Sequence, residues 1–84
     1  MDLNSVRIEI NKIDKEIVAC MEKRFNLAVE IGKYKKENNL PVYDEVREKK
    51  VIESCIGYLN NKNYASHIEY IYMQIMNSSK ELQL

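Results

Sequence analysis

The chain contains few of the residues that interrupt helices or build metal and redox sites. Its 84 residues include one proline, two glycines, two cysteines, one histidine and no tryptophan. Because glycine and proline mark turns and loops, this low content predicts few loops. One histidine and two scattered cysteines are too few ligands at a recognisable spacing, so we expect no metal site. We interpret Cys20 and Cys55 as reduced, buried, small hydrophobic residues within helical patterns.

The chain also lacks an excess of charge and any long apolar run. Thirteen basic and 13 acidic residues give a formal net charge of zero, whereas a nucleic-acid-binding domain usually has a basic surplus. No segment approaches the roughly 20 apolar residues of a membrane span. Charged residues occupy the N-terminal positions where a signal peptide has its apolar run. We therefore expect a cytoplasmic protein that binds neither nucleic acid nor membrane.

The residues that are present are typical of one helical globular domain. Hydrophobic residues make up 45% of the chain and charged residues 31%, which favours a folded protein. Residues 1–84 are enough for a single domain with a small core. Break signals cluster at residues 38–41 and 57–63, and no segment shows the alternation of a strand. The sequence predicts an all-α fold with three helices, one long from about residue 4 to 38 and two shorter from about 44 to 58 and 65 to 82.

The long predicted helix carries an apolar seam that continues through Gly32. We expect this glycine to be helical, and either tolerated or needed for a close backbone approach. A helix of about 35 residues is about 50 Å long, more than two shorter helices of the same chain can cover. We therefore expect a second copy to pack on the seam and form a homodimer. The seam follows steps of three and four residues, with an arginine at position 24, through Leu3, Val6, Ile10, Ile13, Ile17, Cys20, Leu27, Ile31 and Tyr34.

Each predicted helix has one polar residue in its apolar stripe. Arg24 interrupts the long seam, Glu48 is in line with the stripe of the second helix, and Ser79 interrupts the stripe of the third. An unpaired buried charge is costly, so Arg24 either extends to solvent at the helix edge or is held for an anion. Ser79 could instead bond back to its own helix. Together the three residues predict a single polar pocket inside a helical bundle.

Two further basic residues of the long helix are candidates for this pocket. Lys35 follows Arg24 by eleven positions, so the two residues lie on the same face of the helix, about 16 Å apart. A stripe with a basic residue at each end suits a small dianion. On its own, Lys35 could equally belong to a solvated basic edge. Arg7 lies about 25 Å from Arg24 along the axis. Arg7 is therefore a surface residue, unless an antiparallel partner chain brings its own Arg7 to the site.

The ends of the two shorter helices supply three more candidates. Asp44 is either the N-cap of the second helix or a pocket acid, and Arg47 and Glu48 share its surface at i+3 and i+4. Gln83 stands one turn after Ser79, so it lies on the same stripe. As the penultimate residue, Gln83 could equally belong to a frayed end.

Four segments of the chain together carry a resemblance to a known family. They are VRIEINKID near the start, EKRFNLAVEIGKYK in the long helix, PVYDEVRE at the loop and NSSKELQ at the end. In this combination the chain resembles the all-helical class of chorismate mutases over essentially its whole length. The resemblance implies an intertwined helical homodimer with two equivalent sites. It also implies conversion of chorismate to prephenate by an intramolecular Claisen rearrangement, without cofactor, metal or covalent intermediate.

The resemblance further implies which residues hold the two substrate carboxylates. Arg24, together with the partner's Arg7, pairs with both carboxylates through guanidinium forks suited to bidentate binding. Arg47 and Ser79 complete the carboxylate-binding wall. A slip of one residue in the register of the third helix would put Ser78 at this position instead of Ser79.

The remaining implied roles concern the breaking bond and the ring hydroxyl. Lys35 contacts the enolpyruvyl carboxylate and the ether oxygen, and Gln83 hydrogen-bonds the same ether oxygen. Glu48 accepts from the ring hydroxyl, with Asp44 and its backbone nearby. The catalytic set implied by the resemblance is Lys35, Gln83, Arg24 and Glu48.

Two other functions fit parts of the same pattern. An isochorismate–pyruvate lyase shares this scaffold and its basic residues, although the serine at the end of the third helix favours the mutase. A non-catalytic helical dimerisation module is the alternative from a different class. It predicts that Arg24→Ala leaves function intact and stabilises the fold, because buried charges often cost stability.

Overall fold

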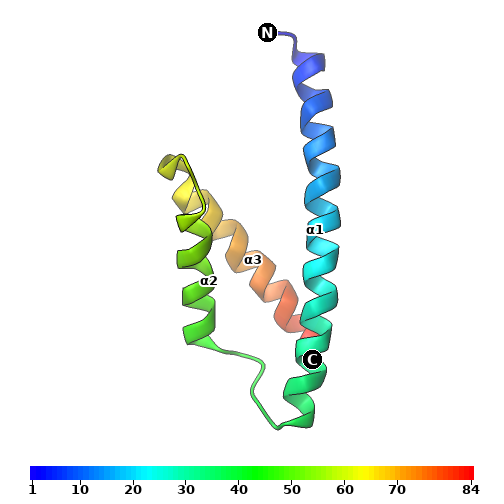
Figure 1. The fold of residues 1–84 in the computed structure, drawn as a ribbon, viewed down its shortest axis with the longest axis vertical. Helices are drawn as coiled ribbons and strands as arrows, with labels where there is room; N and C mark the ends of the chain where they lie inside the picture. The colour runs from blue at the N-terminus through cyan, green and yellow to red at the C-terminus, as the bar shows by residue number, and fades with distance from the viewer.

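The computed structural model describes residues 1–84 as three α-helices joined by short connections, without strands (Figure 1). Helix α1 spans Leu3–Glu37, α2 spans Glu45–Gly57 and α3 spans Ala65–Gln83, with a single 3-10 turn, η1, at Lys62–Tyr64. The predicted all-α class and the three helices are confirmed, and each helix end lies within one residue of its predicted position. Gly32 is helical, as predicted.

Local signals explain where α1 and α2 begin and end. The Asp2 side chain accepts a hydrogen bond from the Asn4 N–H at the start of α1, and Asp44 Oδ1 accepts one from the Arg47 N–H at 3.0 Å at the start of α2. Side-chain acceptors of this kind satisfy backbone donors that have no partner within the helix. After α1, Asn39 adopts the left-handed conformation with φ of 55°, which asparagine tolerates better than most residues.

Helix α3 holds the fold together because it packs against both other helices. Figure 1 shows α2 and α3 running in opposite directions beside α1, while the N-terminal end of α1 projects beyond them. The elongated chain measures 54 × 24 × 15 Å. None of its helices has both the length and the apolar character needed to cross a lipid bilayer.

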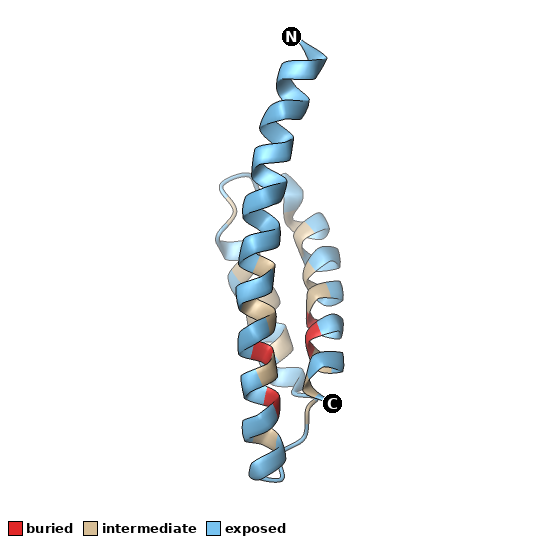
Figure 2. Ribbon diagram, turned by 90° about the vertical axis from the view of Figure 1, so that its right-hand side faces the viewer, coloured by how far each residue is buried: buried red, intermediate tan, exposed pale blue.

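The small core lies where α1 and α3 meet. Four residues are buried, and Figure 2 shows the buried positions only beside the other helices, in the C-terminal half of α1 and in α3. They are Ala28, Gly32, Met76 and Ser79. The prediction that both cysteines are buried is wrong for the single chain, because Cys20 is exposed and Cys55 is only half-buried. The side chain of Cys20 lies on a face of α1 that the single chain leaves exposed.

The apolar seam on α1 is left uncovered by the chain's own α2 and α3. Leu3, Ile10, Ile13 and Ile17 are 44–55% exposed although they lie on one face of a well-formed helix. A large contiguous apolar face on a small protein marks a contact surface for another molecule.

Candidate active site

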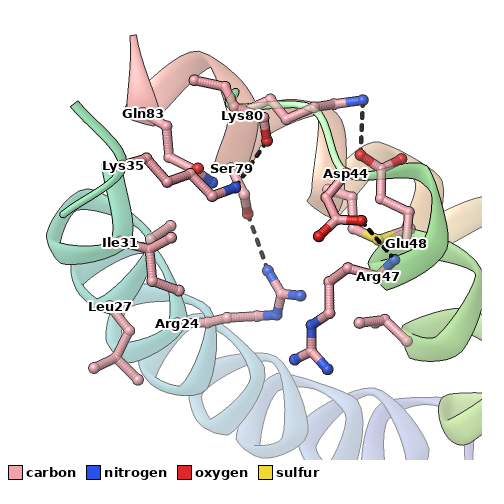
Figure 3. Close-up of a pocket in the computed structure, with 14 residues that line it drawn as sticks. Arg24, Leu27, Ile31, Lys35, Asp44, Arg47, Glu48, Ser79, Lys80 and Gln83 are labelled. Atoms are coloured by element: carbon pink, nitrogen blue, oxygen red, sulfur yellow. Dashed lines mark hydrogen bonds and ion pairs between the residues drawn. The ribbon is translucent and has the colours of Figure 1, made fainter. Parts of the chain in front are cut away.

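A cavity of about 360 Å³ opens between the C-terminal half of α1, the start of α2 and the end of α3 (Figure 3). Its volume falls in the range of pockets that hold small molecules. Seven of the eight predicted site residues line it, and all three helices contribute to them: Arg24, Lys35, Asp44, Arg47, Glu48, Ser79 and Gln83.

Arg24 and Ser79 connect α1 to α3 on the floor of the cavity. Arg24 Nη1 donates to Ser79 Oγ at 3.0 Å, and Ser79 Oγ donates its own proton to the Ile75 carbonyl oxygen at 2.8 Å. Ser79 is only 5% exposed, whereas Ser78 is exposed, so the serine that lines the cavity is Ser79. The back-bonding considered for Ser79 therefore occurs, and the lone pairs that remain on its oxygen hold the guanidinium. Arg24 keeps further N–H donors for a ligand.

Lys35 and Gln83 bring polar groups from α1 and α3 into the cavity. Lys35 Nζ donates to the Val42 carbonyl oxygen at 2.9 Å, which fixes the ammonium group while two of its three donors stay free. Gln83 belongs to the last turn of α3, and its Oε1 is buried without a hydrogen-bond partner. A buried acceptor without a partner costs free energy, so a ligand that donates a hydrogen bond to Gln83 Oε1 gains from the arrangement. The amide NH₂ group of Gln83 is a separate donor.

Gly32 explains how the end of α3 comes so close to α1. A Cβ atom on Gly32 would lie 2.7 Å from Gln83 Cα, closer than real Cβ contacts allow. Of the two interpretations of Gly32, the close backbone approach is therefore correct. The absence of a side chain at position 32 sets the position of Gln83 relative to Lys35.

Glu48 takes part in the most shielded ion pair of the protein. Its Oε2 lies 3.1 Å from Lys80 Nζ, and the two side chains are 24% and 26% exposed. Lys80 Nζ also lies 4.7 Å from the centre of the Tyr43 ring, in the loop before α2. Asp44 acts as the α2 N-cap and also lines the cavity, so both interpretations of this residue hold together.

Lys80 is a charged lining residue that the sequence analysis missed. It lies next to Ser79 in α3, but no pattern within α3 signals a pairing with an acid of α2. The other lining residues are apolar. The apolar lining consists of Leu27, Ala28, Ile31, Val42, Val51 and Met76.

Arg7 is the one candidate that this cavity does not include. It is exposed on the projecting part of α1, away from α2 and α3. Within one chain it serves no site, as expected from its distance along the helix. Its contribution across an interface stays a prediction.

The side chains that line the cavity carry a net positive charge. Four cations and two acids give a formal net charge of +2, from Arg24, Lys35, Arg47 and Lys80 against Asp44 and Glu48. No histidine or cysteine lines it, and nowhere in the chain do three His, Cys, Asp or Glu side chains gather into a group that could hold a metal ion. The lining can therefore bind and orient a small dianion through cationic and neutral donors, with carboxylates available for a hydroxyl group.

Fold and cavity together define a small helical domain with a cationic cavity shared among three helices. Residues 6–84 match the family chorismate mutase type II, so the chain belongs to this family. The resemblance of the four sequence segments is thereby confirmed.

Two curated relatives are bifunctional chorismate mutase/prephenate dehydratases. The protein from Buchnera aphidicola subsp. Schizaphis graminum is 40% identical in an alignment of 80 positions, which covers 93% of this chain and 20% of that protein. The protein from Aquifex aeolicus is 31% identical in an alignment of 87 positions, which covers 98% of this chain and 24% of that protein. The chain thus spans about a fifth to a quarter of the length of these relatives.

A solved structure has the same fold over nearly its whole length. A conserved hypothetical protein from Pyrococcus furiosus superimposes with a TM-score of 0.82 at 36% identity, covering 98% of this chain and 95% of that one.

Proposed function

We propose that the chain is a chorismate mutase, which converts chorismate to prephenate in the biosynthesis of phenylalanine and tyrosine. One observation carries the proposal: seven predicted site residues from three helices line one cavity of net charge +2, in a chain of this family. The prephenate dehydratase named in the relatives is no part of the proposal, because the match covers only a fifth to a quarter of their length. We place the protein in the cytoplasm, a compartment that two unpaired cysteines suit.

The first task of the site is to hold the substrate folded. Chorismate carries two carboxylates, and it reacts only when its enolpyruvyl arm lies over the ring. Arg24, fixed by its bond to Ser79, grips one carboxylate with its free donors. Arg47 reaches the same cavity from α2, and the partner's Arg7 completes the grip. Holding the reacting atoms together removes the entropy cost of reaching that conformer.

The second task is to stabilise the charge that develops as the bond breaks. Negative charge grows on the ether oxygen when the C–O bond lengthens, so donors aimed at this oxygen act more strongly on the transition state than on the ground state. Lys35, held by the Val42 carbonyl, supplies a cationic donor, and Gln83 supplies a neutral one. Glu48, beside Asp44 at the start of α2, accepts from the ring hydroxyl. The rearrangement is intramolecular, so no side chain needs to transfer a proton.

The working unit in this proposal is an intertwined homodimer. The α1 seam is exposed in the single chain, and a second copy running antiparallel would cover it while carrying Arg7 toward the first chain's cavity. Mixing Arg7→Ala chains with Arg24→Ala chains should then restore activity, because one site of each heterodimer receives both substitutions and the other receives neither. No recovery after demonstrated subunit exchange would place Arg7 outside the site.

The decisive experiment is to incubate the purified protein with chorismate and to identify the product by NMR. Prephenate is the expected product. If the protein leaves chorismate unchanged but releases pyruvate when it is incubated with isochorismate instead, it would be reassigned as a lyase on the same scaffold. An Arg24→Ala variant that is more stable and keeps its biological function would instead point to a dimerisation module.

A further inference from the structure

Lys80 is the only cation of the cavity that forms an ion pair with an acid of the cavity. The other two ion pairs of the protein, Lys12–Glu9 and Lys49–Glu45, have side chains 63–72% exposed, against 24% and 26% for Glu48 and Lys80. Exposed ion pairs contribute little to stability because water screens their charges. The Lys80–Glu48 pair is shielded enough for its charges to act on a neighbouring ligand.

The ammonium group of Lys80 is held from two sides. Glu48 Oε2 lies 3.1 Å from its Nζ, and the face of the Tyr43 ring lies on another side, with its centre 4.7 Å away. A cation at this distance from an aromatic face is attracted by the ring. Figure 3 shows the Lys80 side chain reaching from α3 to the Glu48 carboxylate on α2. Lys80 thus engages one carboxylate oxygen and leaves the other for a hydroxyl donor.

We propose that Lys80 is a positioning residue that orients the Glu48 carboxylate and cancels its charge, so that a dianionic substrate can enter a cavity that contains two acids. The proposal rests on the proposed function. With Lys80, the lining has four cations and two acids, and its formal charge of +2 balances the charge of −2 on a dianion. Without Lys80 the charge falls to +1, and Glu48 faces the incoming substrate without a counter-ion.

The first test replaces Lys80 by methionine, which keeps most of the length and removes the charge. For Lys80→Met we expect KM for chorismate to rise about tenfold, the order of effect of one charge at a partly shielded site, with a smaller fall in kcat. Lys80→Arg should restore KM to within about threefold of the wild type, because it keeps the charge. The matched control is Lys49→Met, which removes the same charge from an exposed pair near the start of α2 and should leave both constants unchanged.

The second test separates charge compensation from mechanical support. In the double variant Glu48→Gln/Lys80→Met the formal charge of the cavity returns to +2. KM should therefore fall back toward the wild-type value while kcat stays low, because the acid that accepts from the ring hydroxyl is lost. If Lys80 only tied α3 to α2, the double variant would keep the high KM of Lys80→Met, and that result would overturn the proposal.

A binding measurement keeps the two proposals apart. Calorimetric titration with prephenate should rank the variants as KM does. The wild type, Lys80→Arg and the double variant should each bind prephenate more tightly than Lys80→Met. A wild-type protein that forms no prephenate from chorismate would refute the proposed function, and this inference with it. An active wild type whose Lys80→Met variant keeps wild-type KM and prephenate affinity would refute the role of Lys80 alone.

Discussion

Replacing Gly32 by alanine tests how the fold positions the amide of Gln83. The new Cβ would lie 2.7 Å from Gln83 Cα and 3.0 and 3.1 Å from its Cβ and Cγ. Ordinary contact begins at 3.4 Å, and the nearest atom belongs to the backbone, so the last turn of α3 must retreat by about 0.7 Å. Alanine is about 1 kcal/mol better than glycine within a helix, which offsets part of this crowding and keeps the protein folded.

The displacement should reduce the rate more than it reduces stability. A misplacement approaching 1 Å near the reacting atoms can cost about 100-fold in rate, so we expect Gly32→Ala to lower kcat by about 10- to 100-fold. Steady-state kinetics that follow the consumption of chorismate measure this fall, and thermal unfolding monitored by circular dichroism shows whether the helices persist. Gly57→Ala is the matched control, because a Cβ at Gly57 meets nothing within 4 Å; its kcat should match the wild type.

A double variant links the effect to Gln83. If Gly32→Ala acts by moving Gln83, then adding it to Gln83→Ala should lower kcat little further, because the group it displaces is already gone. A Gly32→Ala protein with wild-type kcat would refute the reasoning, since it would show that the approach of α3 to α1 does not control the site.

Three further predictions follow from individual contacts. Lys35→Ala should lower kcat by about 100-fold or more while the oligomeric state measured by sedimentation is kept, because the proposed cationic donor to the ether oxygen is lost; near-normal turnover would contradict the proposed electrostatic mechanism. Ser79→Ala should raise KM for chorismate by about tenfold with little change in stability, because Arg24 loses the acceptor that aims its guanidinium; an unchanged KM would show that Arg24 needs no such support. Burial and the neighbouring Cys55 raise the pKa of Tyr72 above its ordinary value of 10.0. The folded state therefore favours the neutral phenol, and the associated stability is complete below that ordinary value and is lost as the pH rises through the raised one. Chemical denaturation across this alkaline range should show that the free energy of unfolding falls less with rising pH for Tyr72→Phe than for the wild type. The same pH dependence in both proteins would contradict the role given to Tyr72.

The helices were predictable because their signals are local. Apolar spacing of three and four residues, the Asp44 cap and the Asn-rich break before Pro41 act within a few residues of where each helix starts or stops. The polar residues within the apolar stripes were also informative, because an arginine or serine on a buried stripe needs a polar partner. That reasoning and the family resemblance together predicted seven residues that line the cavity.

The cysteines show where local patterns mislead. Cys20 fits the apolar period of α1 but is exposed in the single chain, because burial depends on what packs against that face of the helix. The expected homodimer would bury it, together with the seam. Periodicity identifies the face of a helix that avoids water, but it does not identify the element that covers that face.

The sequence by itself determined three helices, their ends, the apolar seam and the set of polar residues expected to share a pocket, because each depends on spacing along one helix. Only the tertiary structure decided that Lys80 pairs with Glu48 and that Gly32 lies against Gln83. Both contacts join residues far apart in the chain, and they form only because α3 crosses α1 and α2 at one particular place. That crossing results from the summed packing of side chains on three helices, so no single segment encodes it.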